Sequence, residues 1–291
     1  MKLLNVIGAG RVGRTLASLW QAQRTFSVQD VLDGNRQGAL SGVEFIGAGR
    51  AVAALAEMQP AEVWMITTPD RSLAQSAEKL GESGLLRKGD VVFHCSGSMG
   101  SADLQAAAAR GAHIASVHPL KSFADSADAV RTFAGTYCAI EGDSAALEIL
   151  KPAFEQIGGL LSEIDPQFKT IYHGASVVVS NYLTALMEMG LRCYEKAGVP
   201  RDMGAAMMEP IVRETLDNVF KRGTVKALTG PIARGDVEVV ARHIDALTAW
   251  DPKIAAAYRD LGAIALELAR ARGEVERQAL VRLGALLRPG S

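Results

Sequence analysis

Short apolar runs alternate with helical patterns through the first half of the chain. The apolar runs that predict strands are residues 3–7, 26–32, 62–67, 90–95, 113–117, 136–141 and 160–164. Apolar residues recurring at helical spacing predict helices after the first run and at 50–58, 72–80, 102–110 and 145–157. Such alternation is typical of βαβ units, so we expect a doubly wound, largely parallel sheet.

The pattern changes at Asp165-Pro166, after which no strand is predicted. The apolar periodicity there predicts long helices at residues 167–197, 202–222, 236–247, 252–272 and 274–287. The sequence therefore predicts two domains, an α/β domain over residues 1–165 and an all-α domain over residues 166–291.

A glycine-rich turn follows the first apolar run. Gly8, Gly10 and Gly13 form G-x-G-x-x-G between a strand and a helical pattern, which is typical of the Rossmann-type dinucleotide site. The first glycine permits the tight turn, the second lets the backbone approach a pyrophosphate, and the third allows close helix packing. We therefore expect Gly8, Ala9, Gly10, Arg11, Val12 and Gly13 to bind the cofactor. A purely structural turn is the alternative.

The end of the second predicted strand bears on the choice between NAD and NADP. An acid there binds the ribose diol of NAD, whereas an arginine pairs with the 2′-phosphate of NADP. Asp33 occupies the position of the acid, but Asn35 and Arg36 follow it. Arg36 offers a permanent charge for phosphate, which favours NADP and leaves NAD possible. The alternative is that residues 33–35 form only a turn.

Three later loops should lie at the carboxyl edge of the sheet, where dinucleotide and substrate meet. Residues 67–69 (Thr67, Thr68 and Pro69) are small enough to pass beneath a cofactor, and Ser96 and Ser98 place hydroxyls near the expected nicotinamide. His94 and Cys95, the last residues of the predicted strand before the two serines, are expected to be structural, with Cys95 acting as a small apolar residue.

A histidine follows the next predicted strand directly. The pKa of imidazole lies near working pH, so His118 suits proton transfer beside a hydride step. A strand-end histidine that bonds the backbone is the alternative.

The long helix after Pro166 carries a polar stripe on an otherwise apolar surface. At about 100° per residue, one side gathers Lys169, His173, Ser176, Ser180, Asn181 and Thr184. We expect the helix to be buried, so these groups need partners or a ligand. His173 and Asn181 are therefore candidate catalytic residues, with hydrogen bonding between helices as the alternative.

Bulk composition limits the partners. The net charge is −1, which argues against nucleic acid or a membrane surface and leaves a small-molecule substrate. No apolar stretch is long enough to span a bilayer, and Met1-Lys2 leads directly into the first strand. The cysteines are 3 in number and widely spaced, which indicates a reducing compartment, so we expect a cytoplasmic protein. No pattern of metal ligands is visible.

Four segments together resemble a known group of proteins. They are residues 6–13, 116–123, 172–182 and 228–236, the last reading LTGPIARGD. The chain resembles proteins with a Rossmann-like domain followed by a DUF2520 domain, which are described as candidate NADP-dependent oxidoreductases. More distantly, the layout is similar to 6-phosphogluconate dehydrogenase, ketopantoate reductase, pyrroline-5-carboxylate reductase and prephenate dehydrogenase.

The resemblance implies that His118, His173 and Asn181 border the active site and that the chain forms a homodimer. The chain lacks the spacing of four between lysine and asparagine of the phosphogluconate enzymes, so no lysine mechanism is transferred. Lys121 stands where the family suggests glutamine and receives no catalytic role.

The combined hypothesis is an NADP-dependent oxidoreductase that moves hydride to or from a carbonyl, imine or alcohol carbon of a small polar metabolite. In it, His118 or His173 relays the proton, while Ser96, Ser98 and Asn181 orient the substrate. A non-catalytic NADP(H) sensor is the alternative, and a methyltransferase using S-adenosylmethionine is a third.

Overall fold

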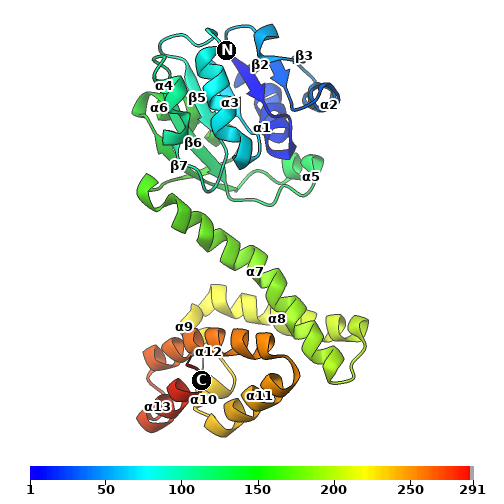
Figure 1. Ribbon diagram of the computed structural model, residues 1–291, viewed down its shortest axis with the longest axis vertical. Coiled ribbons are helices and arrows are strands. Elements are labelled where there is room, and N and C mark those ends of the chain that lie inside the picture. The colour runs from blue at the N-terminus through cyan, green and yellow to red at the C-terminus, as the bar shows by residue number, and fades with distance from the viewer. Residues whose placement is uncertain (289–291) are drawn as a thin grey trace. The chain divides into compact units, whose positions relative to one another are not determined.

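The computed structural model describes residues 1–288, and the chain divides into two compact units, Met1–Asn181 and Tyr182–Ser291. The first unit holds a sheet with flanking helices, and the second is helical (Figure 1). This is the predicted combination of a Rossmann-type domain followed by a helical region. The change from strands to helices falls at residues 164–168, whereas the compact units divide at residue 181. The predicted domain boundary at 165/166 stays a prediction.

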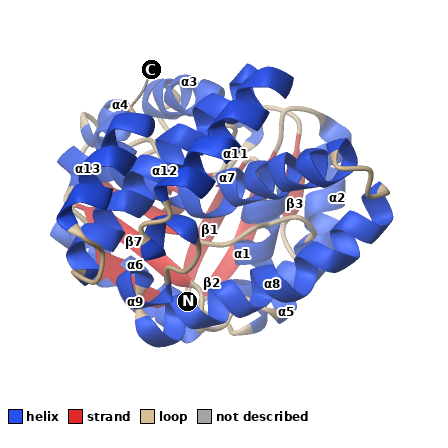
Figure 2. Ribbon diagram, turned by 90° about the horizontal axis from the view of Figure 1, so that it is seen from below, coloured by secondary structure: helices blue, strands red, loops and turns tan. Residues whose placement is uncertain are grey.

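The sheet has the order β3-β2-β1-β4-β5-β6-β7-β8 and is parallel except between β6 and β7. Its strands, red in Figure 2, are β1 Lys2–Ile7, β2 Phe26–Leu32, β3 Arg50–Val52, β4 Val63–Ile66, β5 Val91–His94, β6 His113–Pro119, β7 Tyr137–Gly142 and β8 Leu160–Glu163. The strand order reverses between β1 and β4. Doubly wound sheets bind ligands outside the carboxyl ends of the strands at such a switch point.

The helices of the first unit cover both faces of the sheet. They are α1 Arg11–Ala22, α2 Arg36–Ile46, α3 Asp70–Glu82, α4 Gln105–Ala108, α5 Ser126–Arg131 and α6 Ser144–Gln156. The first half of α7 Lys169–Lys196 also belongs to this unit, but Lys169 is its only buried residue. Successive residues of the strands point to opposite faces. Val63 and Met65 therefore join the core beneath α1 and α6, whereas Trp64 and Ile66 join the core beneath α3 and α4.

Trp20 of α1 is the centre of the first of these cores. It is fully buried, and its ring makes edge contacts with Phe26, Phe93 and Phe154 at centroid distances of 5.4, 6.1 and 5.0 Å. Its indole nitrogen donates to the Ala153 carbonyl at 2.8 Å. The aromatic cluster therefore fixes α1, and with it the glycine turn at the start of that helix.

One predicted element is wrong, and the longest of the helices that were not predicted lies beside it. Residues 50–58 were predicted as a helix but form strand β3 and a single 3₁₀ turn, Leu55–Glu57. Arg50 pairs with the buried Asp30 of β2 at 2.9 Å, so pairing with the neighbouring strand overrides helical periodicity. The helix lies earlier, in α2, where Asn35 caps the first turn and Gly47 closes the last with φ 76°.

The second unit packs around a core of its own. Its helices are α8 Arg201–Arg222, α9 Thr224–Ala227, α10 Pro231–Arg234, α11 Val237–Trp250, α12 Pro252–Arg272 and α13 Arg277–Leu286, with the second half of α7. The core joins Ile232, Val240, Ile244, Leu266 and Leu283. Between residues 1 and 288, no helix combines the length and the apolar character that crossing a bilayer requires.

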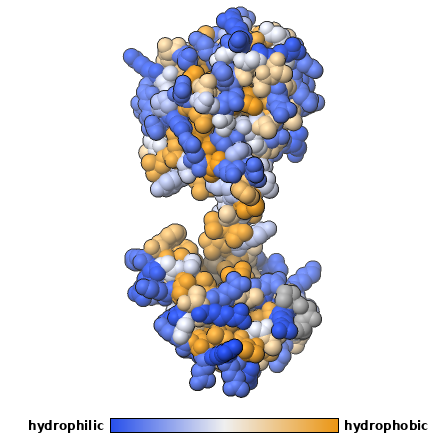
Figure 3. All heavy atoms as spheres, turned by 90° about the vertical axis from the view of Figure 1, so that its left-hand side faces the viewer, coloured by the Kyte–Doolittle hydropathy of each residue, from blue (hydrophilic) through white to orange (hydrophobic). Residues whose placement is uncertain are grey.

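Helix α7 is largely exposed, so the prediction of a buried helix is wrong. Lys169 is its only buried residue, while Val178 and Val179 are 55% and 70% exposed. Apolar colouring runs along the visible stretch of this helix in Figure 3. The polar stripe is therefore not a cost of burial except in the first turn, where Lys169 is enclosed.

Candidate functional site

The glycine turn is shaped by close backbone contacts. Gly8 has φ +100°, and a Cβ atom there would lie 2.7 Å from the Thr67 carbonyl carbon. A Cβ atom on Gly13 would lie 2.3 Å from the Gly8 oxygen and 2.4 Å from Thr67 Oγ1. Thr67 Oγ1 donates to the same Gly8 oxygen at 2.6 Å. Two of the three glycines are thus required for β1, α1 and the β4–α3 loop to meet.

The middle glycine differs, because a Cβ atom on Gly10 would meet nothing within 4 Å. Gly10 lines the cavity and stands at the N-cap of α1, where no side chain caps the helix. The first amides of a helix have no partner within it, and they carry the positive end of the helix dipole. The amino end of α1 therefore presents free donors, as binding of a pyrophosphate requires.

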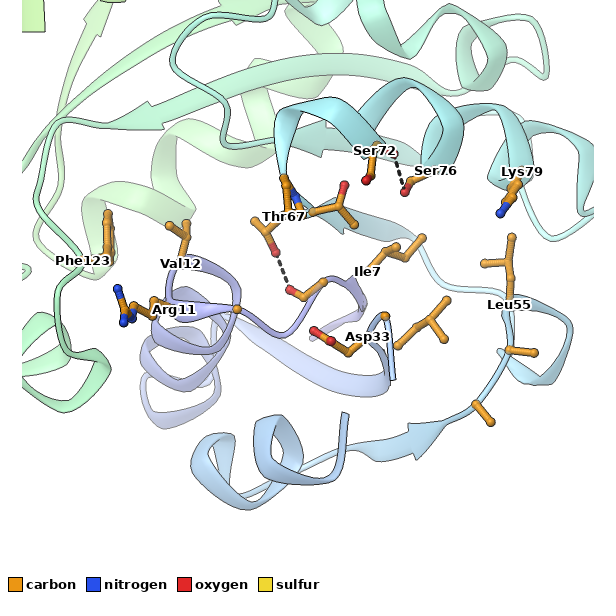
Figure 4. Close-up of a pocket in the computed structure, with 18 residues that line it drawn as sticks. Ile7, Arg11, Val12, Asp33, Leu55, Thr67, Ser72, Ser76, Lys79 and Phe123 are labelled. Carbon is orange, nitrogen blue, oxygen red and sulfur yellow. Dashed lines mark hydrogen bonds between the residues drawn. The ribbon is translucent and has the colours of Figure 1, made fainter. Parts of the chain in front are cut away.

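A cavity of about 1010 Å³ opens over this turn, in the upper range of small-molecule sites. Arg11, Val12 and Phe123 lie together at one end of the close-up view, and Leu55 and Lys79 lie at the other (Figure 4). The predicted cofactor residues that line it are Gly8, Gly10, Arg11, Val12, Thr67, Thr68 and Pro69. Ala9 and Gly13 belong to the same turn but do not line it.

An unpartnered hydroxyl supports a ligand in this cavity. Thr68 Oγ1 is buried and has no hydrogen-bond partner among the described residues, although Thr68 lines the cavity. A buried hydroxyl without a partner is costly, so such groups are normally paired. With the uncapped end of α1, this hydroxyl makes the cavity fit an extended phosphate-bearing ligand such as a dinucleotide.

The loop after β2 is more structural than predicted. Asp33 lines the cavity, and its Oδ2 accepts a hydrogen bond from the Ala9 amide at 2.7 Å. Asn35 Oδ1 accepts from the Gly38 amide at 2.8 Å as the cap of α2. Neither Asn35 nor Arg36 lines the cavity, and Arg36 is exposed at the first position of α2. Their cofactor contacts stay predictions.

One face of α3, which no sequence motif indicated, also lines the cavity. Ser72, Ser76 and Lys79 line the cavity from successive turns, and Figure 4 shows them along this helix. Their spacing of four and three residues places them on one helix face. Because the helix follows the cofactor loop at residues 67–69, that spacing was the signal available in the sequence.

At the carboxyl end of β6, His118 meets the neighbouring residues Tyr172 and His173, which lie more than 50 residues later in the sequence. His118 Nδ1 lies 3.2 Å from the Tyr172 hydroxyl, and the two rings meet edge to face. The His173 ring centroid lies 6.0 Å from that of His118. Tyr172 and His173 belong to the first turns of α7. The structure thus brings the two predicted histidines together and adds Tyr172, which was quoted only as part of the family motif.

His118 is held in its neutral form. Burial, followed by the neighbouring charges of His173 and Lys169, lowers the pKa of His118 to about 4, against the opposing influence of Asp70. Its hydrogen bond goes to a side chain and not to the backbone. The alternative of a strand-end histidine that bonds the backbone is therefore wrong for this residue.

The loop after β5 packs directly on both histidines. A Cβ atom on Gly97 would lie 2.5 Å from His173 Cδ2 and 2.8 Å from His118 Nε2. Ser98 Oγ donates to Asp70 Oδ2 at 2.8 Å, which ties this loop to the start of α3 beside the cavity residue Pro69. Ser96 Oγ accepts from the amides of Ser98 and Met99, so it supports the turn.

Neither serine lines the cavity, and their predicted roles toward cofactor and substrate stay predictions. His94 is fully buried, with Nε2 2.9 Å from the Gly100 carbonyl, which confirms its structural role. Cys95 is partly buried and packs against the first core, as expected of a small apolar residue, and burial raises the pKa of its thiol.

Asn181 lies apart from the histidine cluster along the helix. It follows His173 by eight residues on α7, about 12 Å along the axis, and its Oδ1 accepts from Ser180 Oγ at 2.8 Å. Asn181 is exposed. The structure does not bring it beside His118, and its catalytic role stays a prediction.

Beneath the histidines lies a buried ion pair. Lys169 Nζ lies 3.0 Å from Glu141 Oε1, and the two side chains are only 2% and 3% exposed. Lys169 stood in the predicted polar stripe, but no signal in the sequence linked it to Glu141, which is 28 residues away on β7. Within residues 1–288, no group of three histidine, cysteine or acidic side chains is arranged to hold a metal ion.

Family models match most of the chain. Residues 2–119 match the Rossmann-like domain, and residues 136–264 match the domain of unknown function DUF2520. Both are the domains that the sequence motifs indicated, so the resemblance is confirmed. No curated protein matches the chain.

Solved structures share this architecture. Protein TM1727 from Thermotoga maritima is 25% identical, with a TM-score of 0.74 over 93% of this chain and 99% of that one. A candidate NADP oxidoreductase from Bacteroides fragilis is 21% identical, with a TM-score of 0.69 over 94% and 98%. An imine reductase from Pseudomonas sp. is 18% identical, with a TM-score of 0.63 over 99% of both chains. At these identities the last two establish a common fold.

Proposed function

We propose that this chain, a Rossmann-like domain joined to a DUF2520 domain, is a nicotinamide-dependent oxidoreductase acting on a small polar metabolite. The observation that carries the proposal is the cavity over an uncapped helix end, lined by the unpartnered Thr68 hydroxyl. The names of two structural neighbours, an NADP oxidoreductase candidate and an imine reductase, support the same class of reaction.

The turn at Gly8 to Gly13 would hold the pyrophosphate through the first amides of α1, with the Arg11 guanidinium beside it. Thr68 would give its hydroxyl to the same ligand. Bound there, the nicotinamide would supply the hydride donor or acceptor. The protein's remaining task is to orient a substrate and to move one proton.

His118 is the group we assign to that proton. Its pKa of about 4 lies below the near-neutral value that the sequence argument assumed, so His118 is neutral at pH 7 and a weaker base than free imidazole. The neutral ring has a free nitrogen that can accept a proton from an alcohol or amine that is being oxidised. Tyr172 fixes the ring through Nδ1, and Nε2 lies on the side of Gly97. His173 lies beside it as a second ring that a transferred proton could reach.

A direct test couples turnover to binding. Wild type and the double variant His118→Gln/His173→Gln are incubated with NADP⁺ or NADPH and a panel of hydroxy acids, oxo acids, amines and imines. We expect protein-dependent change in cofactor absorbance, reduced ~10²- to 10⁴-fold in the variant, while NADPH affinity stays within a few-fold. Unchanged turnover in the variant would contradict the proton assignment. Binding without turnover on any substrate class would favour a sensor.

For the cofactor we propose NADP in preference to NAD. Asp33 gives one carboxylate oxygen to the Ala9 amide, which engages it within the protein. The Arg36 guanidinium has no partner among the described residues and follows the cavity residue Gly34 by two positions. Arg11 and Lys79 add positive charge to the cavity lining.

Side-by-side titrations of NADPH and NADH test this choice. We expect Arg36→Ala to weaken NADPH binding ~10-fold, as loss of a charged hydrogen bond does, and to leave NADH binding unchanged. Arg87→Ala is the matched control, because Arg87 precedes β5 and so belongs to the opposite edge of the sheet. Equal affinity for both cofactors in wild type would refute the choice.

Homodimer assembly, implied by the family resemblance, also stays a prediction.

A further inference from the structure

Among the ion pairs of the described residues, Lys169–Glu141 is the one in which both side chains are buried. Taking two charges out of water costs several kcal/mol per ion, and apolar residues of similar volume often serve stability as well. A buried pair is therefore weak evidence for stability. The hydrogen bonds of the two side chains and their position beside the histidines indicate another role for the pair.

Both carboxylate oxygens of Glu141 accept hydrogen bonds. Oε1 accepts from Lys169 Nζ and from the Ser101 amide at 3.0 and 2.9 Å, and Oε2 accepts from Ser101 Oγ at 2.6 Å. Lys169 Nζ also donates to Ser116 Oγ, which lies 3.4 Å from His94 Nδ1. The pair thus joins the first turn of α7 to β5, β6, β7 and the loop that follows β5.

The Lys169–Ser116 contact and the Tyr172–His118 contact join the same strand to the same helix. Ser116 and His118 are two apart on β6 and share a face of the sheet, while Lys169 and Tyr172 are three apart on α7 and share a face of the helix. Lys169 meets Ser116, and Tyr172 meets His118. The two contacts are consecutive along β6 and α7, so the Lys169–Ser116 contact fixes the distance between Tyr172 and His118.

The same pair holds the opposite wall of the site. Ser101 ends the loop that contains Gly97, and both of its polar groups are bound by Glu141. Gly97 in turn fits against the rings of His118 and His173 with no room for a Cβ atom. Loss of the pair would therefore free both the helix and the loop that confine the two rings.

We infer that the Lys169–Glu141 pair is a positioning element for the proposed proton-transfer site: it sets the rotation and depth of α7 so that Tyr172 and His173 meet His118. Neither charge touches the reacting atoms in this assignment. The inference deepens the proposed function and rests on it, but its geometric content is measurable without any substrate or cofactor.

The test uses NMR of the full-length protein with labelled histidine and tyrosine. The chain has only 5 histidines, so the ring signals are resolvable. Cross-relaxation between the His118 ring and the rings of Tyr172 and His173 reports their contact directly. The groups that face His118 are His173, Tyr172, Lys169 and Asp70, so ring contact is a cleaner readout than its pKa, which Lys169 changes by charge alone.

Three variants separate positioning from stability. Lys169→Met leaves the buried Glu141 carboxylate without a counter-ion, and Glu141→Gln does the same to the Lys169 ammonium. Each variant should therefore lower the melting temperature by about 10 °C. The double variant Lys169→Met/Glu141→Gln removes both charges and should recover most of that loss. We expect it still to lack the His118–Tyr172 cross-peaks, and its kcat to fall ~10²-fold with dinucleotide affinity unchanged.

A double variant that regains stability together with the ring contacts would overturn the inference, because the pair would then be structural only. Unchanged ring contacts in the single variants would do the same. If the charge variants fail to fold, Ser101→Ala provides the milder change, and it should weaken the cross-peaks while the protein stays folded; full-strength cross-peaks would refute the inference. If the wild type showed no turnover while the variants still lost the ring contacts, the proposed function would be refuted and the positioning inference would stand.

Discussion

The cofactor cavity and the histidine cluster are built in different ways. The turn under the cavity is local: the Gly8 backbone packs against Thr67, and Gly13 leaves room for the hydrogen bond from Thr67 Oγ1 to the Gly8 oxygen. The cluster joins side chains from β6, the loop after β5 and α7, of which His118 and Tyr172 are 54 residues apart. A site made of backbone leaves a local motif in the sequence, whereas one made of distant side chains leaves only separate candidates.

The largest effect should come from Gly13, where the comparison is sharpest. Gly13→Val places a side chain against the Gly8 oxygen and should destabilise the first unit by ~3 kcal/mol or more, with loss of dinucleotide binding. Gly10→Ala has open space and should keep the melting temperature while weakening dinucleotide binding. Equal loss of stability in both variants, measured by denaturant unfolding, would show that the turn is structural throughout.

Gly97→Ala should affect the histidine cluster and spare the cavity. The added methyl group must displace His118 or His173, which corresponds to overpacking of ~1–3 kcal/mol. We expect kcat to fall by ~10-fold or more with NADPH affinity unchanged. Gly174→Ala is the matched control, because its Cβ atom would meet nothing within 4 Å. A fall in affinity without a change in kcat would contradict the separation of the two regions.

The low pKa of His118 predicts a pH dependence of stability. Its folded-state pKa of about 4 lies below the value of about 6.5 expected in the unfolded chain, so between these values the unfolded chain binds more protons. Stability should therefore fall as pH drops from about 6.5 to 4, by on the order of 1–3 kcal/mol from this residue. His94, whose pKa burial also lowers, adds to the same trend.

Unfolding curves of wild type and His118→Gln across this pH range isolate the contribution of one residue. The variant should show a shallower loss of stability at low pH. Identical slopes for the two proteins would mean that His118 is not held neutral by its surroundings.

Thr68→Val should produce the smallest effect, and its sign is diagnostic. Without ligand, the variant should be as stable as wild type or slightly more stable, because the lost hydroxyl is buried without a partner. With ligand, affinity should fall by ~1 kcal/mol. A clear loss of stability in the free protein, seen by thermal unfolding, would assign the hydroxyl a structural role.

The sequence predicted the fold well where pattern and packing agree. The apolar runs located β1, β4 and β5 because the last four residues of β1 and all residues of β4 and β5 are buried on both faces. It failed at residues 50–58, where the pairing of Arg50 with Asp30 makes a strand that periodicity cannot reveal. It also missed α2, although Asn35 and Gly47 carried the cap signals.

For the site, the glycine turn predicted most of one wall of the cavity. The face of α3 at Ser72, Ser76 and Lys79 was readable by helical spacing. The Lys169–Glu141 pair was not readable, because it depends on which strand lies beneath the first turn of α7. Polar residues were visible in the sequence, but their tertiary partners were not.

The most direct measurement is a titration of NADPH into histidine-labelled protein, followed by NMR. We expect the ring signals of His118 and His173 to shift along a single saturable curve. His113, at the opposite end of β6 from His118, and His243, on α11 of the second unit, should not move on that curve. Saturable binding with no change at His118 or His173, or no binding at all, would contradict a single oxidoreductase site made from the two regions.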